Sequence, residues 1–431
     1  MKPQNFEESL IWYFIIGAYA IYALGILLPV YSLLAWILFV CLCWRIYKQP
    51  KQEIYIPKVT WIWCMCMLLT LVATYLGIKD YNLGNNDLIR GVVGWLTSSA
   101  VLALFLLSGC LNIRPNIIYR AVCILCLQSL IVIPIAYVAS QVNIPSDLYT
   151  SPIERLIQNG PIFYKVSLYI IDVESKSPRL ALFAPWAPAL GLVSNIYFFL
   201  ALQEPKKVWR YIGVVGAIAM NVVSVSRLAL ISLPLVLIIT WLLNNLTRPS
   251  TQIAAGVMSA LSGIFSTPLV NAARDLADLF YNSRASSSEV RAALAEIVLE
   301  RWEEAPLWGH GIQEPGPLAV AKMPIGSHHT WFGLLFVKGM VGLIALIVPM
   351  LWSFVDLVIK ARESTTAKVS LSILLTLFFF SFGEQIDVLA YLCWPGLIVI
   401  GIAFKERQPS LISVQRENIT TSYFYGRKSS D

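Results

Sequence analysis

The sequence contains only three histidines, and they lie close together at positions 310, 328 and 329. His328 and His329 immediately precede a long apolar run. The unperturbed pKa of a histidine is near physiological pH, so either member of the pair could accept a proton from a hydroxyl group. Metal binding is less favoured, because adjacent residues on a helix point about 100° apart and no HxxxH or HExxH pattern is present. His310 lies between two glycines in "GHGIQEPG", and we expect it to belong to a turn.

Arg291 and Arg227 are the cations whose sequence surroundings suggest a bound anion. Arg291 follows Ser286 and Glu289, which have the spacing of a capping box and predict that a helix begins there. A cation in the first turn meets the positive end of the helix dipole, so either an anionic ligand or a pair with Glu289 would offset the repulsion. Arg227 is flanked by apolar sequence in "VVSVSRLALISLPL". It either extends to lipid headgroups or marks an anionic substrate site.

Composition indicates what kind of elements position these side chains. Hydrophobic residues make up 57% of the 431 positions and charged residues only 13%, against about 25% charged in soluble proteins. Apolar runs of about 20 residues predict membrane spans, and their length and uniformity favour helices over the strands of a closed barrel. We therefore predict an all-α polytopic membrane protein with about twelve spans. They are expected at 10–28, 30–44, 60–77, 91–110, 118–139, 181–202, 209–225, 228–243, 252–269, 331–354, 369–385 and 388–404.

Lysines and arginines predict the orientation of these spans. They cluster in the segments 44–58 and 203–210, which we expect on the cytoplasmic side. Alternating spans then put both termini inside and leave two long outer loops, at 140–180 and 270–330. The formal net charge of +7 follows from this topology. We therefore expect a lipid bilayer as a partner and no nucleic acid.

The chain divides into three regions by this topology. Residues 1–177 form an N-terminal transmembrane bundle with an outer loop, and 178–404 form a second transmembrane region that includes the loop 270–330. Residues 405–431 form a basic cytoplasmic tail. The eight cysteines lie within or at the ends of predicted spans, where we interpret them as packing residues without metal or redox chemistry.

The order of motifs in the second region resembles the O-antigen ligase and O-antigen polymerase superfamily. The matching stretches are "VSVSRLAL", "EVRAALAEIVLERWEEAPLWGHG" and "SHHTWFGLLFVKGMVG", and together with "PRLALFAPWAPALGL" they cover roughly residues 178–345. When Gly339 and Gly342 are aligned with the paired glycines of the family, the family histidine falls on His328. His329 departs from the asparagine that is usual at the next position.

The resemblance implies a membrane glycosyltransferase of the bacterial cytoplasmic membrane, with its active site facing the periplasm. Such enzymes transfer a glycan from undecaprenyl diphosphate to an acceptor hydroxyl on a glycan or lipid, with inversion and without a metal or other cofactor. Arg227 and Arg291 would stabilise the diphosphate leaving group, and His328 would be the base. His329 would replace the asparagine as a donor, or would itself be the base.

Two further cations are implied in substrate binding. Arg179 belongs to the arginine, phenylalanine and proline pattern before a span. Lys338 lies about two turns inside its predicted span, and either extends outward or lines the cavity for the lipid diphosphate.

The predicted function is that of a ligase, favoured slightly by the single large helix-containing loop at 270–330. A polymerase of the same superfamily is the alternative. A polysaccharide-lipid transporter or flippase is less favoured, because the sequence shows no convincing internal repeat.

Overall fold

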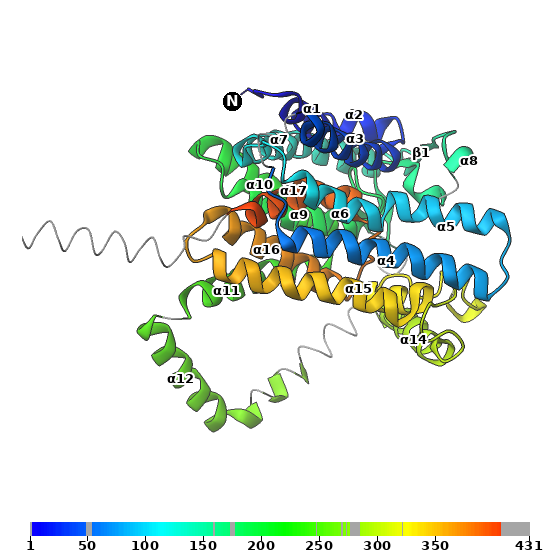
Figure 1. The fold of residues 1–431 in the computed structure, drawn as a ribbon. Helices are drawn as coiled ribbons and strands as arrows, with labels where there is room; N and C mark the ends of the chain where they lie inside the picture. The colour runs from blue at the N-terminus through cyan, green and yellow to red at the C-terminus, as the bar shows by residue number, and fades with distance from the viewer. Residues whose placement is uncertain are drawn as a thin grey trace, which may run out of the picture.

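The fold is known from a computed structural model of the chain, which is mostly helical (Figure 1). It describes residues 2–48, 54–157, 160–172, 177–246, 248–268, 270–272, 274–275, 285–320 and 322–406. Most of the predicted tail at 405–431 and part of the predicted loop at 270–330 lie outside these residues.

Helices follow one another along almost the whole chain, as the apolar runs predict. They are α1 (Phe6–Ile16), α2 (Ala18–Ala23), α3 (Leu27–Lys48), α4 (Lys58–Asp80), α5 (Asn85–Thr97), α6 (Ser99–Ser108), α7 (Pro115–Gln141), α8 (Glu154–Ile157), α9 (Ala187–Ala201), α10 (Lys207–Ser224), α11 (Arg227–Asn245), α12 (Pro249–Ile264), α14 (Ala285–Trp302), α15 (Thr330–Lys360), α16 (Thr365–Phe380) and α17 (Ala390–Lys405). Single 3-10 turns lie at Pro161–Phe163 and Leu318–Val320.

The prediction of about twelve spans is not confirmed. Across the described part of the chain, six helical stretches are long and apolar enough to cross a membrane, and a seventh forms if the bent pair Pro249–Ile264 and Ser266–Ala272 is one span. The six are Leu27–Lys48, Lys58–Asp80, Asn85–Ser108, Pro115–Gln141, Arg227–Asn245 and Thr330–Lys360. The second predicted span, 30–44, is part of a longer helix, whereas 10–28 breaks at Gly17 into two short pieces.

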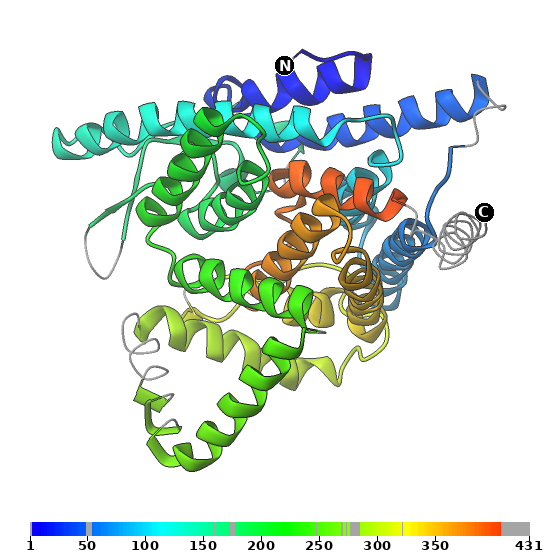
Figure 2. The same cartoon turned by 90° about the vertical axis from the view of Figure 1, so that its left-hand side faces the viewer.

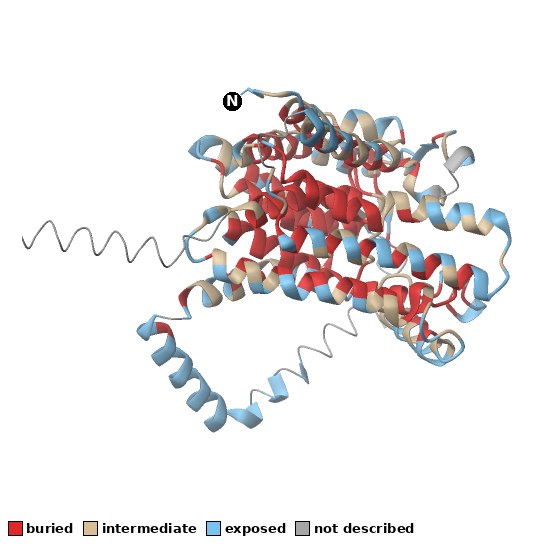
Figure 3. Cartoon of the chain, viewed as in Figure 1, coloured by how far each residue is buried: buried red, intermediate tan, exposed pale blue. Residues whose placement is uncertain are grey.

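Three apolar helices are too short to be counted as membrane spans. Their apolar composition is explained by burial among other helices. Helices α9, α16 and α17 have 15 or 16 residues, which gives a length of about 24 Å against a hydrocarbon thickness of about 30 Å. Nearly every residue of α9 and α17 is buried by other helices. Buried residues fill the middle of the bundle, whereas α12 is almost wholly exposed and projects away from it (Figures 1–3). The central helices are thus shielded by protein around their full circumference.

Polar contacts join the helix ends in two separate groups. One group pairs Arg120 with Glu204 and sets the Lys405 Nζ against the Cys110 carbonyl at 3.1 Å. The other group joins the Trp186 Nε1 to Glu384 at 2.8 Å. Trp186 and Glu384 belong to the candidate site described below. That site therefore lies at one end of the bundle.

Two small antiparallel ladders form within the segment 140–180, which was predicted to be an outer loop. Strand β1 (Asp147–Thr150) pairs with β2 (Lys165–Ser167), and β3 (Ile170–Ile171) pairs with β4 (Pro178–Arg179).

Helix α14 begins earlier than the capping-box pattern predicts. It already includes Ala285, so Ser286 lies inside the helix and is not its N-cap. Alanine and the serines after it continue the helical backbone. Arg291 therefore lies in the second turn rather than the first. It shares with Leu294 and Val298 the face that packs on the start of α15.

Helix α15 is interrupted at Gly339, and the segment 306–311 fills the gap. Gly339 has φ 61° and ψ −161°, a conformation open essentially to glycine. The freed backbone groups pair with the inserted segment: His310 N with Phe336 O (2.9 Å), Gly311 N with Val337 O (2.9 Å), Met340 N with Pro306 O (2.9 Å) and Val341 N with Leu307 O (3.2 Å). A Cβ at Gly309 or Gly339 would lie 2.3 to 2.5 Å from backbone atoms of the other segment. The glycines in "GHG" and "KGMVG" thus allow two stretches of backbone to touch.

Candidate functional site

A cavity of about 30 Å³ between α14 and the start of α15 brings together three of the predicted site residues. Arg291 comes from α14, and His328 and His329 come from the turn that precedes α15. Phe332 and Phe382 form the apolar part of the wall. Residues 37 or more positions apart in the sequence thus meet in one small cavity.

The turn that carries the histidines is held in place by the link between α16 and α17. The Gln385 side-chain amide donates to the Gly326 carbonyl at 3.1 Å. The Thr330 hydroxyl donates to the Glu384 carbonyl at 2.6 Å and accepts from the Ile386 amide at 3.0 Å. His328 has φ 62°, a left-handed conformation that histidine tolerates better than most residues. The direction of its side chain is therefore fixed by backbone contacts on both sides.

His329 is the N-cap of α15. Its Nδ1 accepts a hydrogen bond from the Phe332 amide at 3.3 Å, so this nitrogen carries no proton. In a neutral ring the proton is then on Nε2, which makes that atom a donor. The ring lies between Phe332 and Phe382, with centroid distances of 4.3 and 5.9 Å. His329 thus offers one acceptor to the helix and one donor elsewhere, as an asparagine side chain would.

The imidazole of His328 differs from that of His329. No hydrogen bond joins its imidazole to another residue within the described part of the chain. Burial, and then the charge of Arg291, lower the pKa of His328 from 6.5 to about 4, and the same two causes lower the pKa of His329 to about 4. Both rings are therefore neutral at pH 7, and His328 can accept a proton.

Arg291 is a half-buried cation that makes no ion pair with a carboxylate among the described residues, although its charge acts on the pKa of Glu384. Among the described residues, none forms a hydrogen bond or ion pair with its guanidinium. The Oγ of Ser327, on the same cavity wall, is buried and has no hydrogen-bond partner among these residues. A half-buried charge and a buried hydroxyl are both costly without partners, so this cavity is suited to a polar, anionic group.

Glu384 is a site residue that the sequence analysis missed. Its carboxylate accepts from the Trp186 Nε1 at 2.8 Å. Burial raises its pKa to about 7, while Arg291, the Trp186 hydrogen bond and Arg179 act in the opposite direction. The signal was present in "FGEQID", where acidic and amide residues separate two apolar runs.

Arg227 follows the turn between α10 and α11, and Arg179 of β4 contacts that turn. Arg227 is the first residue of α11, directly after the N-cap Ser226. The next residue, Leu228, and the Nη1 of Arg291 both lie beside Gly383, at 2.8 and 3.9 Å from the position of a Cβ on that glycine. The start of α11 is thus next to Arg291.

Arg179 holds the end of α10. Its guanidinium donates to the Ser224 carbonyl at 3.0 Å and to the Val225 carbonyl at 3.2 Å, and it pairs with Asp172 at 3.2 Å. These contacts fix the turn that leads to Arg227.

Lys338 and His310 lie away from the small cavity. Lys338 is buried in α15, donates to the Ser99 hydroxyl at 2.7 Å and pairs with Asp387 at 3.6 Å. His310 is buried in the inserted segment, with Nδ1 at 3.1 Å from the Phe336 carbonyl. The turn at 306–308 ends before His310, which lies in irregular backbone.

Fold and composition together define a class of protein, a helical protein of membranes. No family model and no curated protein sequence matches the chain. Within the described residues, no three His, Cys, Asp or Glu side chains come together in a way that could hold a metal ion.

Proposed function

We propose that the protein is a membrane glycosyltransferase of the O-antigen ligase type. It transfers a glycan from undecaprenyl diphosphate to an acceptor hydroxyl at the outer face of the bacterial cytoplasmic membrane. The observation that carries the proposal is that Arg291 and His328 line one cavity, and that neither the guanidinium nor the imidazole forms a hydrogen bond or ion pair with any of the described residues. The order of motifs in residues 178–345 supports the same assignment.

The cation and the base have separate tasks in this reaction. The acceptor oxygen attacks the anomeric carbon, its proton passes to a ring nitrogen of His328, and the bond from the anomeric carbon to the phosphate oxygen breaks. Undecaprenyl diphosphate leaves with the electron pair of that bond, and the configuration inverts. Arg291 stabilises the negative charge that grows on the leaving group. The base and the cation act on the same reacting bond and must therefore lie close together. Arg291 and His328 line the same cavity.

Binding of the donor also adjusts the base. In the free protein, burial and the charge of Arg291 hold the pKa of His328 at about 4, which makes it a weak base. A diphosphate beside Arg291 offsets that charge, which is the smaller of the two causes, and so shifts the pKa of His328 upward while the effect of burial remains.

Three residues support this pair in the proposed mechanism. Arg227, at the start of α11 beside Arg291, is the second cation for the diphosphate. Arg179 positions the turn that carries Arg227. His329 fills the role of the family asparagine, because its Nδ1 caps α15 and its Nε2 is left to donate.

Glycan transfer by the purified full-length chain tests the proposal. We expect His328→Asn and Arg291→Ala each to lower kcat/KM for transfer by about 10²- to 10⁴-fold, the range of general-base and electrostatic contributions. Asparagine is chosen because it tolerates the left-handed backbone at position 328. Glu296→Ala, on the exposed face of the same helix as Arg291, is the matched control and should transfer like wild type. Wild-type rates in folded His328→Asn would contradict the assignment of the base.

The acceptor separates the ligase from the alternatives. The assay is run with a lipid-linked core acceptor and, separately, with a second carrier-linked glycan. Product on the first acceptor indicates a ligase, and elongation of the second indicates a polymerase. Movement of the carrier-linked glycan across vesicles without a covalent product would indicate a transporter.

A further inference from the structure

A second cavity of about 440 Å³ lies beside the small one, and the proposed chemistry leaves it unassigned. Its volume is within the range of about 300–1,000 Å³ that is usual for small-molecule sites. Its wall comes from α4, α5 and the first part of α15, together with the segments 311–313 and 385–388. It therefore lies at the same end of the bundle as the histidines.

The two cavities share a wall. Gln385 lines the larger cavity and donates to the carbonyl of Gly326, which lines the smaller one. Gly333, in the first turn of α15, also faces the larger cavity, and a Cβ there would lie 2.5 Å from the Gln385 amide. The lack of a side chain at position 333 thus lets the wall between the cavities be thin.

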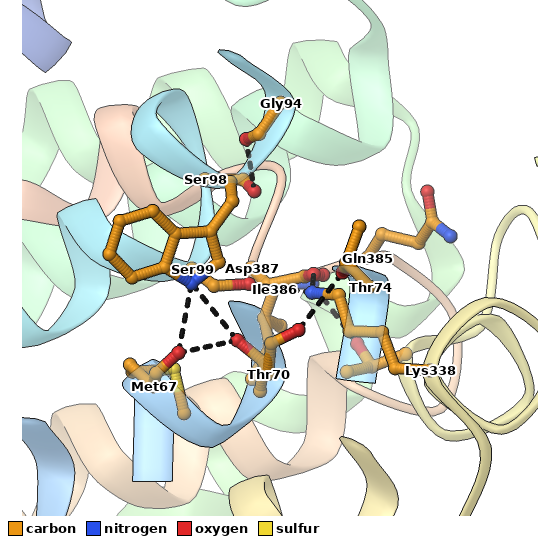
Figure 4. Close-up of polar contacts among 12 residues, drawn as sticks. Met67, Thr70, Thr74, Gly94, Ser98, Ser99, Lys338, Gln385, Ile386 and Asp387 are labelled. Atoms are coloured by element: carbon orange, nitrogen blue, oxygen red, sulfur yellow. Dashed lines mark hydrogen bonds and ion pairs between the residues drawn. The ribbon is translucent and has the colours of Figure 1, made fainter. Parts of the chain in front are cut away.

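The charges in the larger cavity are paired, in contrast to Arg291. Lys338 lies 3.6 Å from Asp387 and donates to Ser99 at 2.7 Å (Figure 4). Arg90 lies 3.7 Å from Asp87. Because each cation already has a carboxylate, this cavity offers little to an anion and suits a neutral polar ligand.

The remaining lining has the chemistry of a sugar site. Gln313 and Gln385 supply amides, and Thr74, Thr97 and Ser98 supply hydroxyls. Trp95, Trp186 and Phe163 supply aromatic surface. A pyranose ring has an apolar face that packs on aromatic rings, and a rim of hydroxyl groups that pair with amides, hydroxyls and carboxylates.

Trp186 connects this surface to the proposed chemistry. Its ring lines the larger cavity, while its Nε1 donates to Glu384, whose pKa responds to Arg291. A single side chain thus lines the larger cavity and contacts the carboxylate near Arg291.

We propose that the larger cavity is a saccharide subsite, which rests on the proposed function in that the sugar belongs to the donor or acceptor glycan. The neutral glycan occupies this cavity while the diphosphate lies against Arg291. One sugar face packs against the tryptophans, and the glutamine amides and the two ion pairs bond to its hydroxyls.

Gly94→Leu tests the proposal without a large risk to folding. Gly94 lines the cavity, and a Cβ built on it meets nothing within 4 Å. The position is inside α5, where replacement of glycine raises helix propensity. Gly256→Leu in α12 is the matched control, because it is also helical, also has nothing within 4 Å, and does not line the cavity.

The probes separate this proposal from the proposed function. They are undecaprenyl diphosphate without sugar, the carrier-linked glycan of the producing cell, and the free glycan released from that carrier by mild acid. We expect Gly94→Leu to weaken binding of the free glycan by at least tenfold, while sugar-free undecaprenyl diphosphate binds within twofold of wild type. Gly256→Leu should bind all three probes as wild type does.

The source of the sugar follows from two further readouts. If the donor glycan occupies the cavity, Gly94→Leu also raises the Kd for the carrier-linked glycan. If the acceptor occupies it, that Kd is unchanged and the KM for the acceptor rises. Unchanged binding of free glycan together with an unchanged acceptor KM would overturn the saccharide subsite. Wild-type protein that binds free glycan but transfers none would instead count against the glycosyltransferase and leave the subsite standing.

Discussion

His329 allows a sharp test, because its predicted role is to cap a helix rather than to move a proton. In His329→Ala the Phe332 amide loses its only side-chain acceptor, the Nδ1 at 3.3 Å. Loss of an N-cap costs about 0.5–2 kcal/mol of stability. The bond is long for a nitrogen acceptor, so we expect a cost of about 1 kcal/mol. His329→Asn restores an acceptor at the same position and should recover most of this difference.

The measurement is the free energy of unfolding of the purified chain in mixed detergent micelles, followed by intrinsic fluorescence. Glycan transfer is measured on the same samples. His329→Asn should transfer within about twofold of wild type, and His329→Ala should lose about fivefold, because about 1 kcal/mol of positioning corresponds to roughly that factor.

The outcome that refutes this reasoning is specific. If His329→Asn is as stable as wild type but loses 10²-fold or more in transfer, the ring itself is the base and His328 is not. If both His329 variants are as stable as wild type, the hydrogen bond from Phe332 does not contribute to the helix.

Two further predictions concern backbone close to the site and its pH dependence. Gly339→Ala should destabilise the chain by about 1–3 kcal/mol, because φ is 61° and its Cβ would lie 2.3 Å from the Leu307 carbonyl oxygen; a thermal unfolding midpoint equal to that of wild type would contradict the close contact. Burial and Arg291 lower the pKa of His328 and His329 from 6.5 to about 4. The free energy of unfolding should therefore be highest above about pH 6.5 and should decrease as the pH falls toward 4, because the unfolded chain takes up protons first. The acid limb of kcat/KM, which reports the free enzyme, should therefore lie near pH 4, and a limb near pH 6.5 would show that the rings are solvated.

The sequence predicted the helices well and their roles less well. Apolar runs marked nearly every long helix, since helical backbone is the general solution for an apolar segment. The predicted number of spans is not confirmed, because an apolar run of 15 residues has the same sequence pattern whether lipid or protein surrounds it. Helices α9 and α17 are apolar since other helices cover them.

The candidate site, too, was predicted only in part from the sequence. Residue type and motif order pointed to Arg291, His328 and His329, because the chain has only three histidines and the resemblance includes an arginine near the start of a helix outside the spans. The start of α14 was misplaced, since a Ser-to-Glu spacing also occurs inside helices. Glu384 was missed because nothing local shows that it faces Trp186 and lies near Arg291.

The sequence by itself determined that the protein is helical and apolar and that it carries histidines and arginines near one predicted membrane face. Only the tertiary structure decided which of these groups meet. Among the described residues it left Arg291 without an ion pair, whereas Lys338 pairs with Asp387, and one nitrogen of His329 caps a helix. The physical reason is that composition and periodicity report what a segment can bury, whereas pairing of charges depends on which segments touch. Those contacts join residues far apart in the chain.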